Sequence, residues 1–250
     1  MTENGVAKAV LFGLDLGEYD MEKSMDELSA LAQACGMEAV AQLVQKRDTP
    51  ESATYLGEGR LAEGRLLCMN LGAECAIFDA ELSGSQIRNL EQILEVPVID
   101  RTMLILEIFK RRAVTNEGKL QTELATLRYR LPRLAGLGES LSRQGGGGTG
   151  VPIVALVGYT NVGKSSLLNR LCGAEVPAAD MLFATLDPTA RKLTLPSGLD
   201  VVVVDTVGFV SRLPHGLVEA FKSTLEEAAY ADVIVKVCDL SDPESSQQLA

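Results

Sequence analysis

Residues 158–165 read GYTNVGKS and fit the pattern G-x-x-x-x-G-K-[ST] of a phosphate-binding loop. An apolar run of strand length precedes them at 151–157, and a stretch with helical spacing follows at 166–171. Strand, glycine-rich loop and helix are the elements that such a loop requires. The alternative is an ordinary glycine-rich turn between a strand and a helix. We favour the phosphate loop, because both flanking elements are predicted at the right places.

A loop of this kind points backbone N–H groups at a triphosphate, and the N-terminus of the following helix adds a favourable dipole. We expect Lys164 to reach the β- and γ-phosphates and the Ser165 hydroxyl to bind Mg²⁺. The predicted nucleotide-binding residues of the loop are Gly158, Tyr159, Thr160, Asn161, Val162, Gly163, Lys164, Ser165 and Ser166.

A second group of candidate residues follows the apolar run at 199–204, which predicts a buried strand. An acid at the carboxyl end of a strand beside the phosphate loop is placed to lie near Mg²⁺. The N–H of a glycine three residues later is placed to meet a γ-phosphate. The predicted site residues here are Asp205, Thr206, Val207 and Gly208.

The composition restricts the class of protein. The net charge of −11 argues against a surface that coats nucleic acid, although residues 101–150 carry nine Lys/Arg against four Asp/Glu. Those basic positions could face RNA phosphates, but solvated helix faces are the favoured interpretation. The five cysteines form no C-x-x-C pair, which is typical of reduced thiols in a cytoplasmic protein. No apolar run reaches the length of a membrane span.

Strands alternate with helices over the first part of the chain, which predicts a small parallel α/β domain. We expect its first helix to open with a capping box at 24–27 and to end at Gly36. Two helices with basic positions follow from Arg101, and the run of glycines at 145–150 predicts a linker. The predicted fold class is α/β, with domains at 1–144 and 151–250 joined by that linker, and the second domain a P-loop GTPase domain. The expected strands are 9–14, 37–44, 75–79, 96–99, 191–195, 201–205 and 233–238, and the expected helices are 24–36, 58–71, 85–94 and 214–229.

These motifs together resemble the HflX family of GTPases, within the Obg-like group. The resemblance rests on GYTNVGKS at 158–165, LFATLDPT at 182–189 and DTVGFVSRLPH at 205–215. It extends to YLGEGR at 55–60, DRT at 100–102, EGKLQ at 117–121 and LSRQGG at 141–146. The combination is specific and covers nearly the whole chain.

The resemblance implies a cytoplasmic, Mg²⁺-dependent GTPase that binds the large ribosomal subunit and its rRNA and can split stalled ribosomes. It implies no DNA partner. Residues 183–187 become switch I, residues 205–208 switch II, and Thr185 joins Ser165 and Asp205 as a metal ligand. The resemblance makes Lys164, Thr185 and Gly208 catalytic residues. For the segment around Thr185 alone, the alternative is an ordinary turn formed by its Asp-Pro pair. The switch I residues so assigned to the nucleotide site are Phe183, Ala184, Thr185, Leu186 and Asp187.

The resemblance bears on hydrolysis and ion use as well. Phe209 stands where Ras-like GTPases carry a water-orienting glutamine, which implies slow intrinsic hydrolysis and activation by the ribosome. Some Obg-like relatives use an asparagine matching Asn161 to hold K⁺, and a loop-shaping hydrogen bond is an equal alternative. Two other functions stay open: a nucleotide-gated binding module with negligible hydrolysis, and an ATP-using P-loop enzyme.

The sequence departs from the family pattern at two places. The glycine segment continues in the family into a long charged helical hairpin, whereas Gly150 here runs straight into Val151. The Asn-Lys-x-Asp motif that reads guanine in the family does not occur within the 250 residues. We therefore expect a form that lacks the hairpin and the C-terminal part of the GTPase domain.

Overall fold

The computed structural model describes residues 6–113, 115–135, 152–173, 189–209 and 231–241. The chain divides into two compact units, Met1–Arg111 with Thr126–Leu137, and Arg112–Ala125 with Gly138–Ala250. The predicted linker at 145–150 and the predicted helix at 214–229 lie outside the described residues. Within the described part of the chain, no helix has the length and apolar character needed to cross a membrane.

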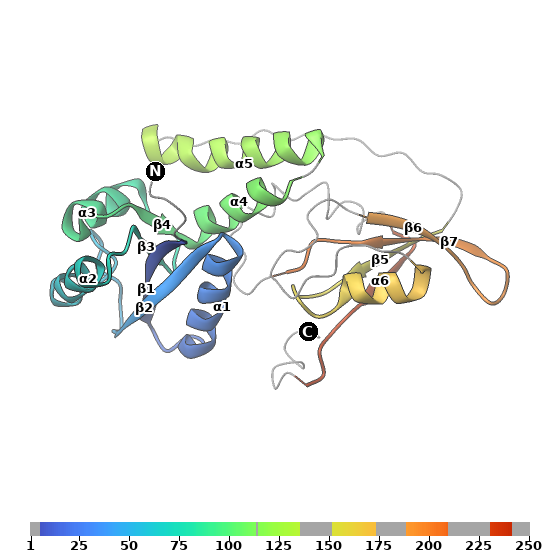
Figure 1. Cartoon of the computed structure of the whole chain (residues 1–250), viewed down its shortest axis with the longest axis horizontal. Helices are drawn as coiled ribbons and strands as arrows, with labels where there is room; N and C mark the ends of the chain where they lie inside the picture. Colours follow the sequence, from blue (N-terminus) through green and yellow to red (C-terminus); the bar gives the residue numbers. More distant parts are fainter. Residues whose placement is uncertain (1–5, 114, 136–151, 174–188, 210–230, 242–250) are drawn as a thin grey trace. The chain divides into compact units, whose positions relative to one another are not determined.

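The first unit is built on a four-stranded sheet in the order β2-β1-β3-β4, and all neighbouring strands are parallel. Helix α1 lies on one face, and α2 and α3 lie together on the other (Figure 1). This arrangement confirms the expected parallel α/β fold. The elements are β1 (Ala7–Asp15), α1 (Met21–Ala34), β2 (Met37–Lys46), α2 (Glu58–Leu71), β3 (Cys75–Phe78), α3 (Gly84–Leu94), β4 (Val98–Asp100) and α4 (Arg101–Arg112). Helix α5 (Asn116–Ala135) follows, and the division between the two units falls within it, at Thr126.

The core of this unit is built on its central strands. Phe12 of β1 and Phe78 of β3 are fully buried and stack with ring centroids 4.8 Å apart. Side chains of parallel strands covered on both faces read as continuous apolar runs, as AVLF at 9–12 does. The apolar runs therefore identified both strands correctly.

The predicted capping box at 24–27 is wrong. Helix α1 begins at Met21, and Asp20 caps it by accepting a hydrogen bond from the N–H of Lys23 at 3.2 Å. Ser24 lies inside the helix, buried, and its hydroxyl donates to Asp79 Oδ2 at 2.6 Å. The reciprocal cap occurs instead in α3, between Ser83 and Gln86.

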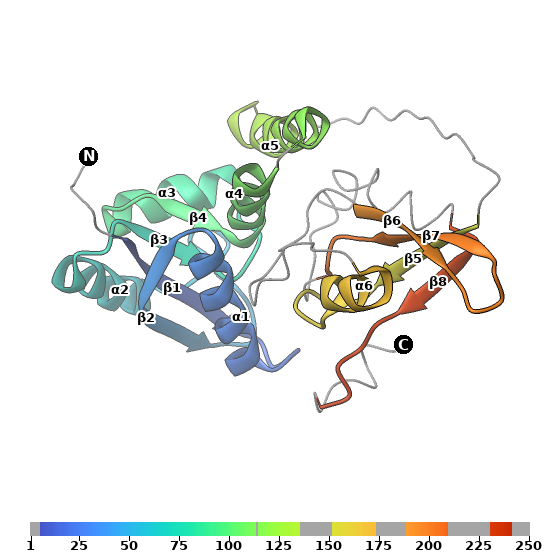
Figure 2. The same ribbon diagram turned by 45° about the vertical axis from the view of Figure 1, so that its right-hand side comes forward.

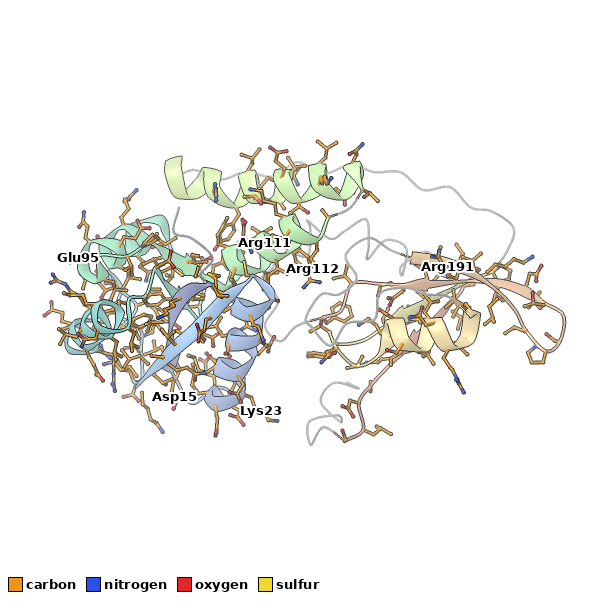
Figure 3. The ribbon with its side chains drawn as sticks, viewed as in Figure 1. Asp15, Lys23, Glu95, Arg111, Arg112 and Arg191 are labelled. Carbon is orange, nitrogen blue, oxygen red and sulfur yellow. The ribbon has the colours of Figure 1, made fainter. Side chains whose placement is uncertain are left out.

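Arg101 is not one of the basic surface positions. Its side chain is only 3% exposed and forms ion pairs with Asp79 Oδ1 at 2.7 Å and Glu27 Oε1 at 2.8 Å. The neighbouring Asp100 is also buried and accepts the N–H groups of Leu82 and Met103. The DRT residues of 100–102 therefore join β4 and α4 to the rest of the unit. Figure 3 shows Arg111 and Arg112 at the far end of α4.

The second unit contains a sheet in the order β6-β7-β5-β8, in which β6 is antiparallel to β7 and the other pairs are parallel (Figure 2). Leu156, Leu168, Val201 and Val203 form its described core. Helix α6 follows β5 after the loop at 158–163, as predicted for the phosphate loop. The elements are β5 (Ile153–Val157), α6 (Lys164–Cys172), β6 (Thr189–Thr194), β7 (Asp200–Asp205) and β8 (Val233–Lys236).

Candidate functional site

The GYTNVGKS loop connects the carboxyl end of β5 to the first turn of α6. Gly163 caps the helix with φ 90° and ψ 21°, and Asn161 has φ 65°. Gly158 lies against the backbone beyond β8: a Cβ on it would stand 2.2 Å from the Val237 carbonyl oxygen. Only glycine fits there, so the first glycine of the motif is required by packing as well as by access to a ligand.

Lys164 is folded over its own loop. Its Nζ donates to the carbonyl oxygens of Gly158 at 3.0 Å and Tyr159 at 2.8 Å, and the residue is 6% exposed. Burial lowers the pKa of Lys164 to about 8, and the nearby Asp205 carboxylate opposes that shift. The loop thus holds a cation whose burial disfavours its charge, which an anionic ligand would relieve.

Ser165 and Asp205 bring the loop and the end of β7 together. The Ser165 hydroxyl donates to Asp205 Oδ2 at 2.6 Å, and Asp205 is fully buried. The Thr206 hydroxyl donates to the Leu156 carbonyl oxygen at 2.7 Å, which joins β7 to β5 just below the loop. The Thr206 side chain therefore supports the site from within the sheet.

The segment after β7 packs directly on the loop. Thr160 N–H donates to the Phe209 carbonyl oxygen at 2.7 Å, and Phe209 N–H donates to the Gly158 carbonyl oxygen at 3.1 Å. A Cβ on Gly208 would stand 2.4 Å from Thr160 Cα, so a larger residue would not fit. Nothing in the side-chain pattern could have predicted this bridge, because it is made by backbone atoms.

The structure brings together two of the three predicted groups, residues 158–166 and 205–208. The third group, residues 183–187, lies outside the described residues. Among the described residues no three His, Cys, Asp or Glu side chains form a metal cluster. The Ser165 hydroxyl and the Asp205 carboxylate instead place two hard oxygen atoms side by side. This pair suits Mg²⁺, which takes one or two protein oxygens and completes its shell with water and phosphate.

Three family models match successive parts of the chain. They are described as GTP-binding GTPase N-terminal (residues 22–110), GTP-binding GTPase Middle Region (112–162) and 50S ribosome-binding GTPase (153–250). The boundaries fall close to those of the two α/β parts of the fold, and the third model includes the whole loop.

Curated relatives match over nearly the full chain. A protein named GTPase HflX from Caldanaerobacter subterraneus subsp. tengcongensis is 46% identical over 286 positions, covering 97% of this chain and 67% of its own. GTPase HflX of Alkalihalophilus pseudofirmus is 42% identical, covering 98% and 69%, and that of Escherichia coli is 40% identical, covering 90% and 63%. Because the first alignment runs over 286 positions against 250 residues, that relative carries internal positions with no counterpart here.

Solved structures of GTP-binding proteins also resemble this chain over most of its length. A GTP-binding protein from the hyperthermophilic archaeon Sulfolobus solfataricus in complex with GDP is 25% identical, with a TM-score of 0.52 over 97% of this chain and 75% of its own. The complex of SsGBP with GDP is 26% identical, with a TM-score of 0.55, covering 97% and 76%.

Proposed function

This chain belongs to the HflX family of GTPases, and we propose that it binds GTP at residues 158–166 and 205–208 and hydrolyses it to GDP and phosphate. The observation that carries the proposal is the pairing of Ser165 with Asp205 beside the buried Lys164. The GDP complexes of the structural relatives support guanine nucleotide as the ligand.

The residues of the loop divide the work of binding. Backbone N–H groups and the N-terminus of α6 hold the phosphate oxygens, and Lys164 moves from its two carbonyl partners to the β- and γ-phosphates. Ser165 and Asp205 would hold Mg²⁺, and the ion would supply positive charge that offsets the negative charge of the phosphates. Thr185 is proposed as a further ligand, within a nucleotide contact formed by residues 183–187.

The bridge between Phe209 and the loop affects the γ-phosphate position. The Thr160–Phe209 hydrogen bond holds the residue after Gly208 on the loop, and we propose that this bond opens when Gly208 N–H contacts a γ-phosphate. Phe209 has no group that could orient water, so we propose slow hydrolysis by the chain alone. An activating partner would supply the missing group.

We propose the large ribosomal subunit and its rRNA as that partner. The match of residues 153–250 to a family described as 50S ribosome-binding GTPase supports this choice. The exposed cations of α4 and α5, such as Lys110, Arg111 and Arg128, are candidates for contacts with rRNA phosphates, whereas the buried Arg101 is not. Such contacts would make the affinity fall steeply with salt.

A single-turnover assay with and without large subunits tests the function. We expect slow Mg²⁺-dependent release of phosphate from GTP, accelerated by subunits, and no release by Lys164→Ala. Unchanged, negligible hydrolysis in the presence of subunits would favour a nucleotide-gated binding module. Because the guanine-reading motif does not occur within the 250 residues, similar use of ATP and GTP fits the proposal, whereas hydrolysis of ATP with GTP left unused would favour the ATP-using alternative.

The ribosome contact has its own test. Replacing Arg111 and Arg112 with alanine should flatten the salt dependence of co-sedimentation with large subunits, whereas Arg65→Ala, on α2, should leave it unchanged.

A role for Asn161 in holding K⁺ predicts faster hydrolysis in K⁺ than in Na⁺. Equal rates would leave Asn161 only its role in shaping the loop.

A further inference from the structure

Helix α5 carries a stripe of leucines on its exposed side. Leu120, Leu124 and Leu127 are 67%, 49% and 51% exposed, and their spacing of four and three residues places them on one face. Thr122 and Ala125, on the opposite face, are buried. The helix is thus packed on one side and presents a second apolar side, and contiguous exposed apolar surface of this kind marks an interaction site.

The spacing of the stripe is that of a two-helix coiled coil. In heptad terms Leu120 and Leu127 occupy d positions and Leu124 occupies an a position. In an antiparallel pair of identical helices, residues at heptad position a of one copy pack against residues at heptad position d of the other. Leu124 then meets Leu127 of the second copy, and the two-fold axis repeats the contact.

The charges beside the stripe are complementary in the same register. Glu123 and Arg130 are both exposed. Each comes directly before a residue at heptad position a, so both lie on the same flank of the stripe. Antiparallel pairing places such flanks opposite each other, so that Glu123 of each copy faces Arg130 of the other. The helix macrodipoles also oppose each other in this arrangement, which favours it over a parallel pair.

We propose that two copies of this chain associate through an antiparallel pairing of their α5 helices, with Leu124 against Leu127 and Glu123 against Arg130. The inference does not depend on nucleotide binding. An RNA partner fits the stripe less well, because RNA is held mainly through phosphate contacts, to which leucines contribute nothing. One helix pair is a small interface, so we expect a weak dimer whose population rises with protein concentration.

Sedimentation equilibrium of the 250-residue chain over a range of concentrations tests the proposal. We expect a monomer–dimer equilibrium, weakened at least about tenfold by the double substitution Leu124→Gln and Leu127→Gln. Leu66→Gln, a matched change at an exposed position of α2, should leave it unchanged. A monomer at all concentrations, or a dimer indifferent to the α5 substitutions, would overturn the proposal.

Charge reversal tests the register. Glu123→Arg should weaken the dimer by placing like charges together, and adding Arg130→Glu should restore it. Rescue by Arg128→Glu instead would contradict the antiparallel arrangement, because Arg128 lies on the other flank and meets Glu123 only in a parallel pair. If the chain is monomeric and the leucine substitutions abolish its binding to large subunits, the stripe contacts the ribosome and self-pairing is overturned.

Discussion

Ser165 and Asp205 are 40 positions apart in the sequence and are joined by a hydrogen bond of 2.6 Å from Oγ to Oδ2. The bond places the two protein oxygens proposed to hold Mg²⁺ side by side. If they act as that pair, Ser165→Ala should lower the Mg²⁺-dependent part of the GDP affinity at least about tenfold. Calorimetric titration of both proteins with GDP, with and without Mg²⁺, measures this change in affinity.

The control for that prediction is Ser165→Thr, which keeps a hydroxyl at the same position and should retain the Mg²⁺ effect. If Ser165→Ala and wild type responded equally to Mg²⁺, the metal would have to be held elsewhere.

Lys164 predicts a pH dependence of nucleotide affinity. Its pKa is lowered to about 8 by burial, and bound phosphates favour the charged form, so the pKa is higher in the complex. Affinity is therefore fully present below pH 8 and falls above it by up to about tenfold per pH unit. Calorimetry with GDP between about pH 7 and 9.5 should show this fall, and in Lys164→Ala the weak residual affinity should not change with pH. A wild-type affinity that is constant over this range would contradict the role of the lysine.

Gly208→Ala should separate the switch segment from the loop. The added Cβ would meet Thr160 Cα at 2.4 Å, and that backbone atom cannot move aside as a flexible side chain could. We expect a loss of about 1–3 kcal/mol from the free energy of unfolding of the second unit, and faster hydrogen exchange of the Thr160 and Phe209 amides. Gly59→Ala is the control, because a Cβ there meets nothing within 4 Å. Unchanged exchange in Gly208→Ala would mean that the bridge does not form in solution.

Arg101→Ala should destabilise the first unit. The substitution leaves the buried Asp79 carboxylate without its ion-pair partner, which costs about 3–5 kcal/mol. Arg65 forms an ion pair with Glu95 in which both side chains are substantially exposed, so Arg65→Ala should cost less than about 1 kcal/mol. Urea denaturation followed by circular dichroism compares the two variants. If both variants lose a similar free energy of unfolding, the ion pairs of Arg101 contribute no more to stability than an exposed ion pair does.

Local patterns were sufficient to predict the strands and the phosphate loop. Apolar runs mark β1, β5 and β7 because parallel and central strands are covered on both faces. The loop was predictable because its chemistry depends on residue types at fixed spacing. Asp205 was predictable because it ends a strand beside that loop.

The errors arose where a partner is distant in sequence. Ser24 fits a capping box, but its hydroxyl is used by Asp79, 55 positions away. Arg101 was counted with the basic surface because nothing near it in the sequence identifies Asp79 and Glu27 as its partners. The Phe209–Thr160 bridge is made by backbone atoms, and backbone atoms carry no residue signal.

Titration of the 250-residue chain and of its Lys164→Ala variant with GDP, in the presence of Mg²⁺, is the decisive test of the phosphate site. We expect one GDP bound per chain, dependent on Mg²⁺, and only a weak residual affinity in the variant while its circular dichroism spectrum stays unchanged. A folded Lys164→Ala protein that binds GDP as tightly as wild type would contradict the assignment of residues 158–165 as the phosphate site.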